Sequence, residues 1–115
     1  MMANKRVYLD HAATTPIHPE VIEEIYHVMK TCYGNPSSIY SEGQHAKERV
    51  ETARDTVAEA INASGNEIYF TASGTESDNW AVKGAALKQF GKKMHVITSA
   101  IEHHAVLHSV QALEK

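Results

Sequence analysis

Two short apolar runs, each followed by a stretch of helical periodicity, constrain the fold of this chain more than any other feature. The runs are EIYFT at residues 67–71 and MHVITS at residues 94–99. Helix-like stretches follow them at residues 75–90 and 102–114, where apolar side chains recur every three or four positions. The order strand, helix, strand, helix predicts an α/β layer with parallel strands.

The N-terminal half of the chain adds two helices, each preceded by a polar loop. Pro19 suits the first position of a helix, and the apolar spacing predicts a helix over residues 19–32. Ser41 and Gln44 stand in capping-box register. This spacing predicts that a second helix begins at Ser41 and ends near Asn62.

Composition and charge exclude several classes of function. The 115 residues suffice for one domain, and 43% apolar with 22% charged residues is typical of a globular protein. Eleven Lys and Arg against fourteen Asp and Glu give a net charge of −3, which does not favour nucleic acid or an anionic membrane as partner. No apolar run approaches the roughly 20 residues of a membrane span. The one cysteine, Cys32, cannot form an internal disulfide, which favours a reducing cytoplasm.

The turn after the first apolar run reads TASGTES and carries almost no large side chain. A helix N-terminus presents amide groups without partners and a partial positive charge. Gly74 lets a ligand approach the backbone, and Ser73 and Thr75 add hydroxyl donors, so the turn indicates a cup for a phosphate dianion. It is neither a Walker loop nor a G-x-G-x-x-G turn. Ser73 and Glu76 also fit a capping box that needs no ligand, and the spacing leaves both interpretations open.

The SAIEHH segment at residues 99–104 places histidines after the second apolar run. A right-handed crossover puts the C-terminal ends of both strands at one edge of the sheet, where ligands of open α/β sheets bind. A neutral imidazole there can stack on a flat ring, donate a hydrogen bond or move a proton. His104 and His108 lie one helical turn apart, but no third ligand is evident, and we predict no metal site.

Four motifs in this order, YLDHAATTP, YGNPSS, TASGTESDN and ITSAIEHHAVL, resemble the N-terminal part of cysteine desulfurases. These NifS- and IscS-like enzymes form part of the class V aminotransferase family, and the resemblance runs from about residue 6 to the end. It implies part of the type I fold of transferases that depend on pyridoxal 5′-phosphate (PLP), with PLP as cofactor. Residues 1–18 would be an N-terminal arm on the small-domain side. Residues 19–115 would be the first, incomplete part of the large PLP-binding domain, whose sheet is mostly parallel.

The resemblance also implies roles for particular residues. Gly74, Thr75 and Glu76 match the turn that binds the cofactor phosphate. His103 matches the histidine that lies over the pyridine ring and is a candidate for proton transfer, which leaves His104 no special role. The residues that match the substrate side are His11, Ala12, Ala13 and Asn35.

The implied reaction converts L-cysteine to L-alanine and leaves the sulfur as a persulfide on an enzyme cysteine. Sulfur-acceptor proteins of iron–sulfur cluster assembly or tRNA thiolation would then receive it from a cytoplasmic homodimer. The family's Schiff-base lysine and catalytic cysteine match no residue here, so we expect this chain alone to be inactive and to expose apolar helix faces. The alternatives are a selenocysteine lyase, a non-catalytic remnant acting as a structural or interaction module, and a stand-alone binder of phosphate ligands.

Overall fold

The computed structural model of the chain describes residues 6–89 and 95–114. The chain divides into two compact units, residues 1–65 and residues 66–115, and each is considered by itself. A short 3-10 helix, η1 (Gly65–Glu67), lies where the units meet in the sequence.

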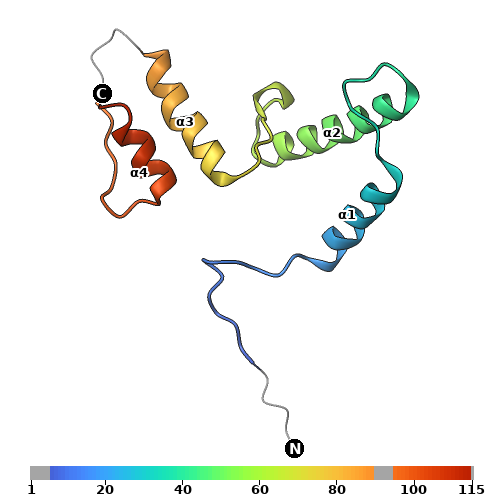
Figure 1. Ribbon diagram of the computed structural model, residues 1–115, viewed down its shortest axis with the longest axis horizontal. Coiled ribbons are helices and arrows are strands. Elements are labelled where there is room, and N and C mark those ends of the chain that lie inside the picture. The colour runs from blue at the N-terminus through green and yellow to red at the C-terminus, as the bar shows by residue number, and fades with distance from the viewer. Residues whose placement is uncertain (1–5, 90–94, 115) are drawn as a thin grey trace, which may run out of the picture. The chain divides into compact units, whose positions relative to one another are not determined.

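Four α-helices form in the described part of the chain, two in each unit (Figure 1). The first unit holds α1 (Pro19–Thr31) and α2 (Ser41–Ala60), and the second holds α3 (Gly74–Lys88) and α4 (His104–Gln111). The four predicted helices are therefore confirmed, and only their ends differ. Among the described residues, none of these helices is both long and apolar enough to cross a membrane.

The two predicted strands do not form in the part of the chain that the structure describes. Residues 68–71 and 95–99 are irregular, Glu67 ends η1, and Met94 lies outside the described residues. A strand needs a neighbouring strand to complete its hydrogen-bond ladder, and parallel neighbours come from distant parts of a sequence. The apolar, β-branched composition of these runs therefore predicts a strand only where such a neighbour is present.

Helix α1 begins where the sequence predicts but buries none of its residues. Pro19 occupies the first turn, with Glu20 beside it and Lys30 in the last turn, and both charges complement the helix dipole. The apolar stripe along α1 is 47% to 78% exposed, in agreement with the expected exposure of apolar helix faces. It comprises Val21, Ile22, Ile25, Tyr26 and Met29.

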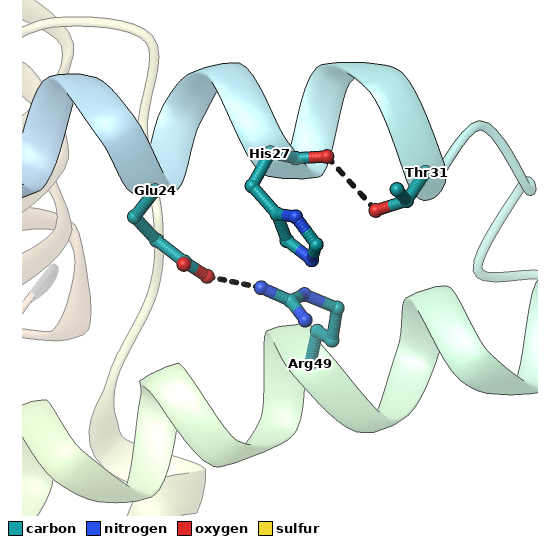
Figure 2. A network of polar contacts seen from close by, with 4 residues as sticks. All are labelled: Glu24, His27, Thr31 and Arg49. Atoms are coloured by element: carbon teal, nitrogen blue, oxygen red, sulfur yellow. Dashed lines mark hydrogen bonds and ion pairs between the residues drawn. The ribbon is translucent and has the colours of Figure 1, made fainter.

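A polar network links α1 to α2 within the first unit (Figure 2). The Arg49 guanidinium on α2 donates to the Glu24 carboxylate on α1. Figure 2 shows the His27 ring on the same side of α1 as Glu24, while the Thr31 hydroxyl donates to the His27 carbonyl at 2.8 Å. Because the ion pair is exposed, we expect it to contribute no more than about 1 kcal/mol.

The loop before α2 packs tightly against the first turn of that helix. The Gln44 side chain donates to the Ser38 carbonyl at 3.0 Å. Gly43 is buried, and a methyl group at its position would lie 2.6 Å from the Asn35 carbonyl oxygen. A methyl group on Gly34 would overlap the carbonyl oxygen of Glu42. Both glycines are therefore required by close approach of loop and helix.

The predicted capping box at the start of α2 is wrong. Tyr40 occupies the N-cap position and has no side-chain cap. The Ser41 hydroxyl donates to the Glu42 carboxylate instead, and Gln44 is engaged with the loop. The sequence has the spacing of a capping box, but in the structure the Gln44 side chain bonds to the Ser38 carbonyl of the preceding loop and does not cap the helix.

The second unit is built on the packing of α3 against α4. Small side chains are buried on these helices, namely Ala86 on α3 and Ala105 and Ser109 on α4. The Ser109 hydroxyl donates to the Ala105 carbonyl at 2.6 Å, so its burial leaves no polar atom unsatisfied. This packing places the first turn of α3 and the start of α4 around one hollow, which is described next.

Candidate functional site

Helix α3 begins with a capping box. Ser73 is the N-cap, and its hydroxyl oxygen accepts a hydrogen bond from the Glu76 amide at 3.3 Å. The Glu76 carboxylate accepts from the Ala72 amide at 2.7 Å, one residue before the N-cap. The predicted capping box is thus confirmed, with a small shift in the partner of the carboxylate. Both the amide and the carboxylate of Glu76 are used in holding the turn.

Two amides at this helix end have no partner in the described part of the chain. The Gly74 and Thr75 N–H groups donate to no residue that the structure describes. Gly74 is exposed and its φ lies outside the left-handed region. A methyl group there would meet no described atom within 4 Å outside its own helix and chain neighbours. The local structure therefore gives no reason for a glycine at position 74.

A hollow of about 250 Å³ is lined by one face of α3, from Thr75 to Lys83, and by the first half of α4 with its N-cap His103. It brings together Thr75 and His103, two of the predicted site residues. Its lining includes one lysine and three histidines but no carboxylate, so its charge suits an anion. In the described residues no three His, Cys, Asp or Glu side chains are grouped to hold a metal ion. The full lining is Thr75, Asn79, Lys83, His103, His104, Ala105, His108 and Ser109.

Asn79 and Lys83 also line the site, although no role was predicted for either; Asn79 is the last residue of the TASGTESDN motif, and Lys83 lies beyond it. The Asn79 side-chain amide donates to the Thr75 carbonyl at 2.9 Å. The Lys83 ammonium donates to the Asn79 side-chain oxygen at 2.5 Å. Thr75, Asn79 and Lys83 follow one another at intervals of four residues, so they lie on one face of α3. That spacing is the sequence signal that identifies them.

His103 is the N-cap of α4 as well as a residue of the hollow. Its Nδ1 accepts a hydrogen bond from the Ala105 amide at 3.2 Å. This bond assigns the proton of the neutral ring to Nε2. The ring can therefore stack or donate through Nε2 without disturbing α4. Accepting a proton at Nδ1 requires release of the Ala105 amide.

The predicted substrate-side residues His11, Ala12, Ala13 and Asn35 all belong to the first unit. The His11 ring meets the Tyr8 ring edge-on, with centroids 5.5 Å apart. The Asn35 side-chain oxygen accepts from the Ser37 amide at 2.9 Å and so shapes its own turn. The position of these residues on the substrate side stays a prediction.

Two hollows of the first unit suit an anion less well because carboxylates line them. One, of about 490 Å³, contains Glu24 and Glu48, and its Arg49 is already paired with Glu24. The other, of about 250 Å³, contains Glu42. Hydrogen bonds from the backbone and from the Ser41 hydroxyl hold the pKa of Glu42 below its ordinary value, so this carboxylate is charged at neutral pH.

Comparisons with known proteins agree with the motifs. The aminotransferase class V family model matches residues 7–115, and the chain belongs to this family. Its relatives within the family include cysteine desulfurase IscS of Methanosarcina thermophila, 53% identical over 111 residues. The alignment covers 96% of this chain and 28% of that protein. An IscS-like cysteine desulfurase of Mycobacterium tuberculosis is 48% identical over 109 residues, covering 92% of this chain and 28% of the relative.

The fold of this chain is similar to that of part of a solved NifS-like protein. That protein matches with a TM-score of 0.86 and 40% sequence identity, over 95% of this chain and 30% of that one. The chain therefore has the fold of the corresponding part of a NifS-like protein, which confirms the predicted fold at that level. The chain spans less than a third of the length of the relatives it matches.

Proposed function

We propose that this chain supplies the phosphate-binding turn and the ring-covering histidine of a PLP-dependent cysteine desulfurase. Gly74 and Thr75 bind the phosphate, Glu76 holds the turn in shape, and His103 covers the pyridine ring. The observation that carries this proposal is Gly74, a glycine with neither a left-handed φ nor a close neighbour, beside two amides without described partners. Its relatives, which are named cysteine desulfurases, support the assignment.

The donors present at the start of α3 fit a phosphate ester. Two amides, the Thr75 hydroxyl and the positive end of the helix dipole all favour a doubly negative group. No carboxylate lines the hollow to oppose it, and the Glu76 carboxylate at the start of α3 accepts a hydrogen bond from the Ala72 amide. The same donor set suits a metal cation poorly.

When bound, PLP supplies an electron sink for bond cleavage next to the amino group of a substrate. The chain's own residues bind and orient it. Gly74 and Thr75 anchor the phosphate, and His103 covers the ring and offers Nε2–H as a donor. Proton transfer through Nδ1 of His103 is coupled to the α4 cap, because the Ala105 amide occupies that atom.

We infer the activity of the whole enzyme from the relatives that are named cysteine desulfurases. The substrate is L-cysteine, the product is L-alanine, and sulfur-acceptor proteins of cluster assembly or tRNA thiolation take the sulfur. The enzyme is a cytoplasmic homodimer, with His11, Ala12 and Asn35 on the substrate side. Residues 1–18 form the arm, and residues 67–71 and 94–99 enter the parallel sheet of the large domain.

The proposal is tested with pyridoxine 5′-phosphate, which has an alcohol in place of the aldehyde and so does not react with lysines. Calorimetry on the full chain is compared with that for pyridoxine, which lacks the phosphate. We expect only the phosphate form to bind. Gly74→Ala is expected to weaken its affinity about tenfold, because a methyl group keeps the phosphate from the amides.

The matched control is Gly84→Ala, the same substitution further along α3, where a methyl group also meets no described atom within 4 Å outside the helix. It should bind the phosphate ester like the unmodified chain. Equal affinities of the two variants, or equal binding of pyridoxine and its phosphate, would rule out the proposed cup.

A further inference from the structure

We propose that Lys83 is a positioning residue for the phosphate-binding turn and acts through Asn79 on Thr75. This inference rests on the proposed function, since it concerns the residues behind the same turn. It assigns Lys83 to orientation of the turn and not to covalent attachment of the cofactor.

The geometry is a series of hydrogen bonds along one face of α3. The Lys83 ammonium holds the Asn79 side-chain oxygen, which orients that amide so that its N–H reaches the Thr75 carbonyl. The Thr75 carbonyl and the Thr75 amide belong to the same first turn, so fixing one restricts the other. A charged donor makes the stronger bond of the two and therefore anchors the series.

Burial and charge separate Lys83 from an ordinary surface lysine. Lys83 is half-buried in the wall of the hollow, whereas Lys88, at the end of the same helix, is exposed. Lysine ammonium groups are rarely withdrawn from water without a partner. No ion pair joins Lys83 to a carboxylate in the described part of the chain. The Asn79 side-chain oxygen is therefore the described partner that holds the Lys83 ammonium in the wall of the hollow.

An isolated pair of Asn and Lys four residues apart would only support the helix. Two features go beyond that role. The series ends on Thr75, one of the two residues at this helix end with an amide that has no described partner. All three residues line the hollow that His103 also lines. If Asn79 and Lys83 only supported the helix, their hydrogen bonds would not need to end on Thr75 or to lie along the wall of the hollow.

The test compares Lys83→Met, which keeps the aliphatic stem and removes the ammonium, with Lys88→Met, which removes the same charge from an exposed position. Affinities for pyridoxine 5′-phosphate and for pyridoxine are measured on the full chain by calorimetry. We expect Lys83→Met to weaken binding of the phosphate ester about tenfold and Lys88→Met to change it less than about twofold. Pyridoxine is expected to show no measurable binding to any of these variants, as for the unmodified chain.

Asn79→Ala provides a second, independent variant. Because Lys83 acts through Asn79, the double variant should bind the phosphate ester within about twofold of Asn79→Ala alone. If the unmodified chain does not bind the ester, both the inference and the proposed function are overturned. If it binds and Lys83→Met behaves like Lys88→Met, or if the losses of the single variants add fully, only the role of Lys83 is overturned.

Discussion

At the scale of single residues, His103 has one task that the structure shows and a second task that we propose. The IEHH motif predicted a ring at the cofactor. The structure adds that Nδ1 of the same ring caps α4 through the Ala105 amide. The two tasks are compatible because the cap uses one ring nitrogen and leaves the other nitrogen and the ring face available.

Two substitutions at His103 separate these tasks. Asparagine is a favourable N-cap without an aromatic ring, whereas alanine lacks both features. We expect His103→Asn to keep the free energy of unfolding near that of the unmodified chain, while His103→Ala lowers it by about 1 kcal/mol. Both should weaken pyridoxine 5′-phosphate binding, since both remove the ring.

Urea unfolding followed by circular dichroism, together with calorimetry, measures both effects. The matched control is His104→Asn, which removes a neighbouring imidazole of the same hollow and should keep affinity within about twofold. Wild-type affinity in His103→Asn would show that the ring plays no part in binding.

The residues of the site differ in how easily the sequence revealed them. Gly74, Thr75 and His103 stand in motifs where small or aromatic side chains follow apolar runs, and the structure brings Thr75 and His103 to one hollow. Asn79 and Lys83 lie inside a helical stretch where polar side chains are usually solvent-facing. Only the packing of α4 beside them shows that their face of α3 lines the hollow.

At the scale of elements, helices were predictable and strands were not. A helix closes its hydrogen bonds within a few residues, so periodicity, Pro19 and capping residues such as Ser73 indicate it directly. A strand depends on a partner segment that the local sequence does not contain. Residues 67–71 and 95–99 have strand composition but no strand conformation in the described chain.

Two glycine-to-alanine substitutions are expected to change the free energy of unfolding in opposite directions. Gly43→Ala places a methyl group 2.6 Å from the Asn35 carbonyl oxygen, and we expect this overpacking to lower the free energy of unfolding by about 1–3 kcal/mol. Gly84→Ala has open space within α3 and should raise it by about 0.5–1 kcal/mol. Urea unfolding of both variants gives the comparison. A Gly43→Ala chain as stable as the parent would contradict the packing of the loop on α2.

At the scale of the whole molecule, the chain exposes unusually many large apolar side chains. Ile39, Ile97 and Ile101 are each more than 90% exposed, and α1 buries no residue. Exposed apolar surface promotes association, so ligand measurements need gel filtration at the same concentration. The family and the exposure were both predictable from the sequence, because motifs and apolar stripes are local features. The sheet was not, because it depends on contacts between distant segments, and the substrate-side arrangement stays a prediction.

The central claim is that the Gly74 and Thr75 amides bind a phosphate ester. The most direct measurement is the set of amide resonances in two-dimensional ¹H–¹⁵N NMR spectra as pyridoxine 5′-phosphate is added. The account predicts large downfield shifts of the Gly74 and Thr75 amide protons, little change at Glu76, whose amide is held by Ser73, and no such shifts with pyridoxine. Unchanged Gly74 and Thr75 resonances at saturating phosphate ester, or equal shifts with pyridoxine, would contradict it.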